Sequence, residues 1–352
     1  MSDNQVRVYD NFAMADIGAR QRFGKSQPTP GDVHNNTPLT NFSVAWFQQQ
    51  SAFAASSAFP TLPVAKQSDL YYTWTRADFN RDDAKVRAPG TRVFRNGASP
   101  STDSYNALVY EFGDAIPDEV RANADSAVNL EMNKTRRVMQ QLMIRRERKF
   151  ATTFLTTGVW TTDITGHAST NTGSNRVYWS TSTSTPIQCI ADAKVAILLA
   201  TGMEANTLVL GYAVREALRY HPDLIARVNA GQTPGGPAEV TDDVLKNIFG
   251  IPNIVVSKAI YNTAKEGGTE SNAFIAGKNA LLCYSDPNPT LDSPTAGLTF
   301  AWTGFPGSSS SGTLVRTMRV DHEYTDEIHG FMSFDMKKVS ADCGYFFSGI
   351  VA

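Results

Sequence analysis

The densest group of side chains that could hold a metal is the stretch RVDHEYTDEIHGF at residues 319–331. Its imidazoles and carboxylates are all potential ligands of a divalent cation: Asp321, His322, Glu323, Asp326, Glu327 and His329. Their spacing matches no established zinc motif, and the HExxH pattern of metalloproteases is missing. In an extended strand, His322 and Glu323 point to opposite faces. A metal-dependent enzyme is therefore only a minor alternative.

No other part of the sequence offers a catalytic pattern. The glycine-rich stretch GQTPGG at residues 231–236 lacks the lysine and serine of a phosphate-binding loop. His34, His167 and His221 have no sequence neighbours that suggest a catalytic triad. The three cysteines lie far apart without a CxxC pair, which favours buried free thiols in a reducing compartment. We expect no enzyme activity and no cofactor.

The composition is typical of a folded chain with many polar loops. Of the 352 residues, 41% are hydrophobic and 19% are charged, and the formal net charge is −2. This near-neutral balance gives no reason to expect a dedicated nucleic-acid-binding protein. The first residues lack the apolar core of a secretory signal, and no stretch reaches the roughly 18 apolar residues of a membrane helix. We expect a protein made in a cytoplasm, with no membrane partner.

The amino-terminal third predicts an arm followed by a long projection. Residues 1–65 mix turn-forming stretches with bulky apolar ones, which favours an arm that docks on a surface. In residues 66–117, DLYYTWT predicts one strand and ALVYEFGDAIP predicts the strand that returns to pair with it. Turn formers around Pro89 and Gly90 join them, through a segment with dense charges of both signs. Such a projection has too little core to be stable alone.

The strongest helical pattern covers residues 126–157, approximately, where apolar side chains recur at near-helical spacing. Gly158 is well suited to end this helix. This helix contains seven basic residues and one acidic residue between positions 134 and 149. The basic residues are Lys134, Arg136, Arg137, Arg145, Arg146, Arg148 and Lys149. A charge run of this kind is, by default, a solvated helix face.

The remaining sequence predicts an α/β region and then a β region. A helix is expected at 189–203, a buried strand at NTLVLG, and one helix at 212–228. A further helix has Thr241 as its N-cap and Gly250 as its stop. From residue 313 to the end, the pattern is mainly that of β-strands.

This order of parts resembles the major capsid proteins of tailed phages that have the Hong Kong 97-like fold. Four stretches are similar to one branch of that family: FPTLPVAKQSDLYYTWTRADFNRDDAKVRAPGTRV, AIPDEVRANAD, LVLGYAVREALRYHPDLIARV and IVVSKAIYN. The resemblance implies an α+β fold. Its parts would be an N-arm at 1–65, an E-loop hairpin at 66–117, a P-domain at 118–190 containing a spine helix at about 126–157, an α/β A-domain at 191–312, and β-strands at 313–352 that return to the P-domain.

The resemblance also implies a structural role. Such a protein self-assembles into the hexamers and pentamers of an icosahedral shell around double-stranded DNA, in the virion capsid, after assembly in the host bacterial cytoplasm. Its partners would be copies of itself, a portal protein at one vertex, a decoration protein and DNA bound without sequence specificity. A separate scaffold protein is expected, because only about 65 residues precede the E-loop. The alternative is an encapsulin-type compartment, which has the same fold and encloses a cargo enzyme.

In this family the E-loop lies over the neighbouring subunit of the same capsomer, and the spine helix lies near the inner face. Charges of both signs on the E-loop suit many weak, reversible contacts. The expected contact residues are Arg76, Asp78, Arg81, Asp82, Asp83, Lys85 and Arg87. The seven bases of the helix could meet packaged DNA or acidic neighbours. They cannot all point one way, so some must pair within the protein. No acceptor is identified for the family's Lys–Asn crosslink, which is not expected here.

Overall fold

The computed structural model describes residues 48–73, 82, 84–93, 95, 101–124, 130–230, 240–291, 293–305 and 307–352. The chain forms two compact units. Among the described residues, the small unit comprises 114–124, 130–136 and 317–328, and the large unit comprises the others. Four elements continue from one unit into the other: β4 (Leu108–Pro117), α7 (Leu130–Phe154), β13 (Thr313–Val320) and β14 (Thr325–Lys338).

A six-stranded sheet forms the centre of the large unit, with the strand order β6–β5–β15–β11–β7–β8. Its strands are β5 (Thr162–His167), β6 (Asn175–Val177), β7 (Thr207–Gly211), β8 (Asn253–Ser257), β11 (Ala280–Cys283) and β15 (Gly344–Ser348). The last strand, β15, lies between β5, to which it is parallel, and β11, to which it is antiparallel. Every residue of β7 and β11 is buried, as expected of strands that are covered on both faces.

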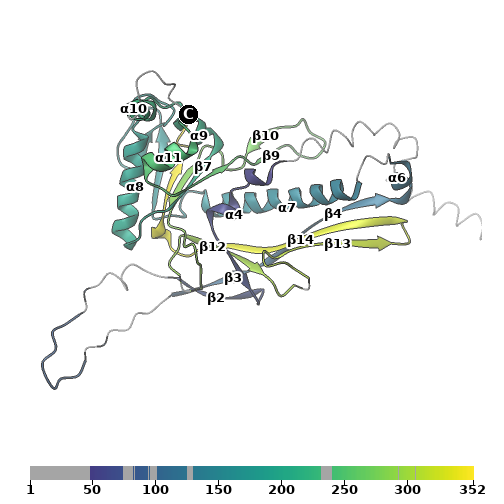
Figure 1. Ribbon diagram of the computed structural model, residues 1–352, viewed down its shortest axis with the longest axis horizontal. Helices are drawn as coiled ribbons and strands as arrows, with labels where there is room; N and C mark the ends of the chain where they lie inside the picture. The colour runs from purple at the N-terminus through teal and green to yellow at the C-terminus, as the bar shows by residue number, and fades with distance from the viewer. Residues whose placement is uncertain are drawn as a thin grey trace, which may run out of the picture. The chain divides into compact units, whose positions relative to one another are not determined.

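Four helices pack with this sheet: α8 (Pro186–Thr201), α9 (Tyr212–Arg219), α10 (Pro222–Ala230) and α11 (Asp242–Phe249). Figure 1 shows them gathered beside the sheet. Their buried side chains form one core cluster with alternate residues of the strands, such as Leu208 and Leu210 on β7 and Phe347 on β15. Alternate residues share one face of a strand, so the four helices cover the same face of the sheet.

Capping residues locate some of these helices correctly from the sequence. Thr241 Oγ1 accepts a hydrogen bond from the Val244 amide at 3.4 Å, and Gly250 ends α11 with a φ of +60°. Both predictions are confirmed. The single helix predicted at 212–228 is wrong, because the structure has α9 and α10 there. Pro222 has no amide hydrogen and disfavours the helical conformation of the residue before it, so the first helix ends.

A second sheet contains β1 (Thr61–Val64), β12 (Gly297–Trp302), β14 and β13 in that order, and β4 also pairs with β14. In the large unit, α7 packs directly on β14, since a Cβ atom added to Gly330 would collide with the side chains of Val138 and Leu142. The 25 residues of α7 lie within the range predicted for the long helix.

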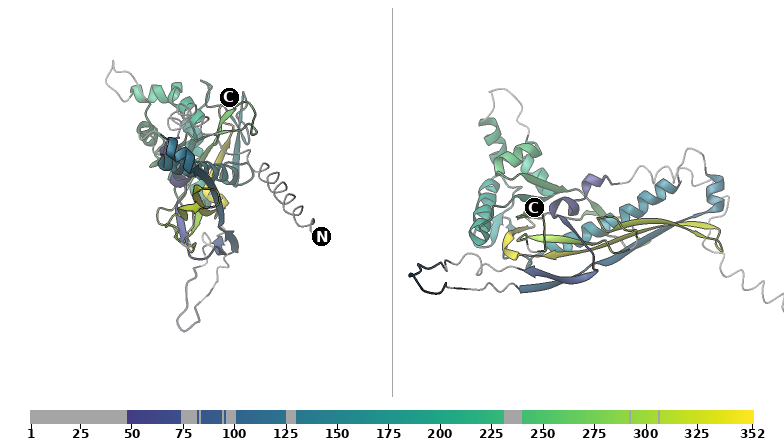
Figure 2. Two further views of the ribbon diagram at one scale, coloured as in Figure 1. Left: turned by 90° about the vertical axis from the view of Figure 1, so that its right-hand side faces the viewer. Right: turned by 60° about the horizontal axis from the view of Figure 1, so that its bottom comes forward.

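The projection begins as an antiparallel hairpin of β2 (Ser68–Thr73) and β3 (Ser101–Asn106), seen in Figures 1 and 2. The prediction that ALVYEFGDAIP is the returning strand is wrong, because this stretch supplies β4. The chain leaves the hairpin at Ala107, whose amide donates to the Gln67 carbonyl at 2.8 Å and whose carbonyl accepts from Ser333 Oγ at 3.2 Å. Only Tyr105 is buried on β3, so STDSYN lacks the apolar alternation that identifies a strand.

The two sheets cross the predicted domain boundaries. Strand β5, from the predicted P-domain, shares a sheet with β7, and β12, from the predicted A-domain, pairs with β14. The names and limits of those domains stay predictions. The other described elements are η1 (Gln50–Ala52), α4 (Ala55–Ala58), α6 (Asp118–Asn123), β9 (Ile260–Asn262), β10 (Asn272–Phe274) and η2 (Ala341–Cys343). Within the described part of the chain, no helix combines the length and apolarity needed to cross a membrane.

Candidate inter-subunit and nucleic-acid-facing surfaces

The tip segment, defined as residues 82, 84–93 and 95, is exposed throughout. Its predicted turn is present: the Thr91 amide and Oγ1 both donate to the Ala88 carbonyl, at 3.2 and 2.8 Å. Gly90 has a φ of +82°, a left-handed conformation that glycine adopts without a steric penalty. Arg87 Nε donates to the Thr91 carbonyl at 2.7 Å. This arginine therefore shapes the turn as well as carrying charge at its surface.

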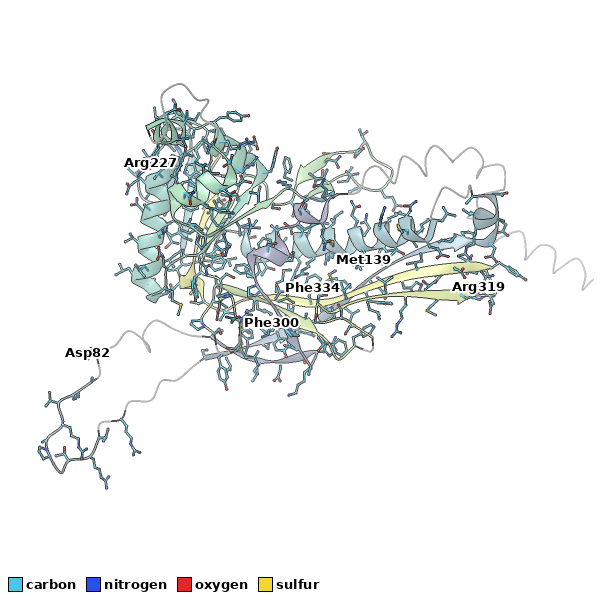
Figure 3. All side chains as sticks on the ribbon, in the orientation of Figure 1. Asp82, Met139, Arg227, Phe300, Arg319 and Phe334 are labelled. Carbon is cyan, nitrogen blue, oxygen red and sulfur yellow. The ribbon has the colours of Figure 1, made fainter. Side chains whose placement is uncertain are left out.

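Three of the seven predicted contact residues lie in the tip segment, namely Asp82, Lys85 and Arg87 (Asp82 is labelled in Figure 3). The others lie outside the described residues: Arg76, Asp78, Arg81 and Asp83. The tip segment also exposes two apolar side chains that the sequence analysis missed. Val86 is fully exposed and Val93 is 64% exposed. The surface therefore offers apolar area between its charges.

Four of the seven basic residues of α7 share one face of the helix, because their spacing of three, eight and three residues keeps them within one stripe. They are Lys134, Arg137, Arg145 and Arg148. Each contacts a side chain within its own unit. Lys134 Nζ lies 2.7 Å from Asp114 Oδ1, and the distances from guanidinium carbon to ring centroid are 5.9 Å for Arg137–Phe112, 5.2 Å for Arg145–Tyr110 and 4.8 Å for Arg148–Tyr261. The expectation that some bases pair within the protein is confirmed.

The other three bases of α7 differ in exposure. Arg136 is exposed and Lys149 is half-buried, and neither forms an ion pair with another residue that the structure describes. Arg146 instead points into the chain: its Nη2 donates to Thr61 Oγ1 at 3.1 Å, and its Nε is buried without a hydrogen-bond partner among the described residues. Burial lowers the pKa of Arg146, because desolvation disfavours the charged form.

Glu147, the single acid among these bases, is only 1% exposed. Its Oε1 accepts hydrogen bonds from the Ala54 amide at 3.1 Å and from Ser257 Oγ at 2.8 Å, and its Oε2 accepts from the Ala55 amide at 2.8 Å. Burial raises the pKa of Glu147, and these hydrogen bonds act in the opposite direction. The carboxylate therefore joins three distant parts of the chain.

Glu147 is not among the residues predicted from the sequence, although the sequence contains a signal for its burial. Positions 143, 147, 150 and 154 follow the spacing of one helix face, and the other three are Met143, Phe150 and Phe154. An acid at an apolar position must find buried hydrogen-bond donors. Which donors it finds depends on residues about a hundred positions away, so the sequence could not identify them.

Two of the candidate metal ligands in the 319–331 cluster, Asp321 and Asp326, instead take part in an ion-pair network in the small unit. Arg319, labelled in Figure 3, donates to Asp118 Oδ1 at 2.7 Å and to Asp326 Oδ1 at 3.2 Å, and Arg121 Nη1 lies 2.5 Å from Asp326 Oδ2. Hydrogen bonds from the arginines lower the pKa of Asp118 and of Asp326. In the described part of the chain, no three His, Cys, Asp or Glu side chains are placed to hold a metal ion.

A buried serine–histidine pair lies beside α10 in the large unit. Ser184 Oγ is 2.9 Å from His221 Nε2, and it donates to the Thr181 carbonyl at 2.7 Å. His221 Nδ1 accepts from the Asp223 amide at 3.2 Å, which leaves the ring proton on Nε2. The Nε2–H therefore faces both Ser184 Oγ and the Thr181 carbonyl, which lies 3.2 Å away, and in this tautomer the histidine cannot accept the serine proton. This pair holds the start of α10 and is not an activated nucleophile.

Comparisons with known proteins agree with the fold described above. No family model matches the sequence. The chain is 25% identical over 325 residues to the major capsid protein of Burkholderia phage BcepMu, an alignment covering 89% of this chain and 95% of that protein.

Two solved structures share the fold. A phage-related protein from Bordetella bronchiseptica RB50 matches with a TM-score of 0.65 and 23% identity, covering 89% of this chain and 96% of the other. The capsid structure of cyanophage P-SCSP1u matches with a TM-score of 0.53 and 13% identity, covering 83% and 86%. The chain is thus similar in sequence to a phage major capsid protein, and it has the mixed helix-and-sheet, Hong Kong 97-like fold of phage capsid proteins.

Proposed function

We propose that this chain is the major capsid protein of a tailed phage and that it assembles into the pentamers and hexamers of an icosahedral shell around double-stranded DNA. The observation that carries this proposal is the similarity to the BcepMu major capsid protein over 89% of this chain and 95% of that protein. We infer a structural protein without enzyme activity, located in the virion after assembly in the bacterial cytoplasm.

Exposed apolar side chains on α8 support self-assembly. The inner face of this helix packs in the core through residues such as Ile190 and Ile197. Its outer face is also apolar, since Val195 is 64%, Leu198 47% and Leu199 84% exposed. A helix that is apolar on both faces is usually buried on both, and adjacent exposed apolar residues often mark a contact with another protein. A further copy of this chain is the partner that the proposed function supplies.

We propose that the hairpin and the tip segment contact the neighbouring subunit of the same capsomer. The proposed polar contacts are Arg76, Asp78, Arg81, Asp82, Asp83, Lys85 and Arg87. Exposed ion pairs are worth about 0–1 kcal/mol each, so they would set register and not strength. Complete burial of a valine side chain contributes about 1.5–3 kcal/mol. Among the described residues of the tip segment, Val86 and Val93 would therefore contribute most of the free energy of this contact.

We propose that α7 faces the packaged DNA through only some of its basic side chains. Arg146 is left out, because its side chain is directed at Thr61 and away from solvent. The proposed surface comprises Lys134, Arg137, Arg145 and Arg148, which share one helix face, with Lys149 at its edge, whereas Arg136 leaves the helix in another direction. Guanidinium groups that lie over aromatic rings keep their charge and their exposed N–H groups, so they can still meet phosphates. Such contacts would be independent of sequence and sensitive to salt.

The proposed function implies other partners. A separate scaffold protein would guide assembly, a portal protein would occupy one vertex, and a decoration protein would bind outside. None of these needs a cofactor from this chain. The encapsulin-type compartment is the alternative with the same architecture, and it differs in what the shell encloses.

The test is expression of the chain, alone and with a candidate scaffold protein, followed by negative-stain electron microscopy. We expect closed shells, or rings of pentamer and hexamer size. A monodisperse monomer under every condition, with the scaffold present, would overturn the proposal. Shells purified from infected cells and treated with nuclease should contain protected double-stranded DNA. Shells that contain a cargo enzyme and no DNA would establish the encapsulin-type alternative.

A further inference from the structure

Residues 54–61 cross α7 between two adjacent charged side chains. On one side, the Glu147 carboxylate accepts from the amides of Ala54 and Ala55, at 3.1 and 2.8 Å. On the other side, Arg146 Nη2 donates to Thr61 Oγ1 at 3.1 Å. Neighbouring helix positions are about 100° apart, so these two side chains leave α7 in different directions. Together they hold both ends of one short run of backbone.

The run itself has little means of holding its own conformation. Helix α4 has only four residues, and its N-cap residue is Ala54, which has no side chain to accept the first amides. Glu147 supplies that acceptor from another element and so acts as a distant N-cap. Phe59, 1% exposed, is the one large side chain of the run that packs on α7, with its ring centroid 4.5 Å from Phe154 and 5.9 Å from Phe150.

The chain before this run is held separately. The Gln48 side-chain amide exchanges two hydrogen bonds with the backbone of Ile260, at 2.7 and 3.0 Å. The Ala52 carbonyl accepts from the Lys258 amide at 3.0 Å. Ser257, which also donates to Glu147, directly precedes Lys258. The Glu147 carboxylate therefore lies where residues 52–55, the end of β8 and the middle of α7 meet.

We propose that Arg146 and Glu147 form one clamp that fixes the crossing of residues 54–61 over α7. Burying a charge is unfavourable unless donors or acceptors compensate it. Apolar side chains at both positions would avoid that cost, but they would leave the Ala54 and Ala55 amides without an acceptor. The clamp is a property of the folded subunit and does not depend on the proposed function.

The competing explanation is that apolar packing of Phe59 holds the run and that the two charges are incidental. Glu147→Gln separates the two explanations, because it keeps the shape of the side chain and removes one acceptor oxygen. Whichever way the new amide is turned, its NH₂ group faces a backbone N–H or Ser257 Oγ. At least one backbone donor then loses its partner or must share one. Phe59→Leu instead weakens the packing and keeps the clamp.

The experiment is hydrogen–deuterium exchange, measured by mass spectrometry on the full-length chain. Peptides that cover residues 52–60 report on the run, and peptides from β7 and β11 report on the stability of the whole unit. Glu131→Gln is the matched control, since it makes the same change on the same helix at a carboxylate whose side chain is 66% exposed. Arg146→Met is a second test of the clamp, at its other end.

In Glu147→Gln we expect about tenfold faster exchange in residues 52–60, with β7 and β11 unchanged. Glu131→Gln should have no effect there, and Phe59→Leu should have a smaller one. The proposal is overturned if Glu147→Gln exchanges like the wild type, if all peptides accelerate together, or if Phe59→Leu has the larger local effect. If Glu147→Gln does not fold, the same criteria apply to Arg146→Met and the peptides around Thr61.

Discussion

Phe300 is the main apolar contact between the β2–β3 hairpin and the second sheet, and truncating its side chain should release that hairpin. The side chain is completely buried on β12 and is labelled in Figure 3. Its ring stacks on Tyr105 of β3 at 4.4 Å between centroids and lies 5.3 Å from Tyr71 of β2. A two-stranded hairpin is at best marginally stable in water, so its order depends on this contact.

Phe300→Ala should lower the free energy of unfolding by about 3–5 kcal/mol, the usual cost of this truncation in a core. That figure includes the two aromatic contacts, which contribute about 0.5–1.5 kcal/mol each. The assay is equilibrium unfolding in urea, together with hydrogen exchange of peptides from β2 and β3. We expect the hairpin peptides to lose protection before those of β7 do.

The matched control is Phe274→Ala. Phe274 is 41% exposed on β10, and its ring lies 5.5 Å from that of Tyr212. Its truncation should cost less than half as much, because less apolar area returns to water. The assignment would be refuted if Phe300→Ala lowered the unfolding free energy no more than the control does. It would also be refuted if hydrogen exchange increased equally in the hairpin and in β7.

Four further predictions follow from single contacts. Burial raises the pKa of Glu147 above its ordinary 4.5, so the folded protein binds this proton more tightly than the unfolded protein does. The unfolding free energy of the wild type, measured in urea at several pH values, should therefore fall relative to that of Glu147→Gln as the pH rises from 4.5 through the raised pKa. A rise of the wild-type value relative to the variant over that range would contradict this reasoning. Gly344→Ala should cost about 1–3 kcal/mol of unfolding free energy, because the new methyl group collides with the buried Trp160 ring; an unchanged melting temperature would show that the ring can move. Leu199→Asp should leave the subunit folded by circular dichroism and prevent shell formation; normal shells would exclude α8 from the subunit contact. Charge reversal at Arg87 should likewise block assembly without unfolding the subunit, as judged by electron microscopy and circular dichroism, and normal shells would show that Arg87 makes no such contact.

Controls for the assembly predictions come from the same surfaces. Tyr220→Asp places a charge at another side chain that is 74% exposed, outside α8, and we expect it to leave assembly intact. Arg87→Lys keeps the charge and loses the guanidinium that bonds the Thr91 carbonyl. It therefore separates the electrostatic role of this residue from its role in the turn.

The sequence by itself determined the features that depend on neighbouring residues. The long helix, the turn at residues 89–90, and the cap and stop of α11 follow from periodicity, glycine and side-chain capping, which act over a few positions. The resemblance to phage capsid proteins rests on the order of such parts. The expectation that some bases of the helix pair internally also needed only the geometry of a helix.

Only the tertiary structure decided which segments meet. Strand β3 is too polar to be recognised, and β2 pairs with it because the chain turns away at Ala107 toward β14. The hydrogen-bond donors to Glu147 belong to Ala55, Ala54 and Ser257, which are separated from it by 92, 93 and 110 positions in the sequence. No local pattern could therefore assign them. Asp326 was a potential metal ligand by residue type, and only the structure pairs it with Arg121, which is distant in the sequence. In each case the partner that satisfies a polar group is distant in sequence, and the fold alone brings it near.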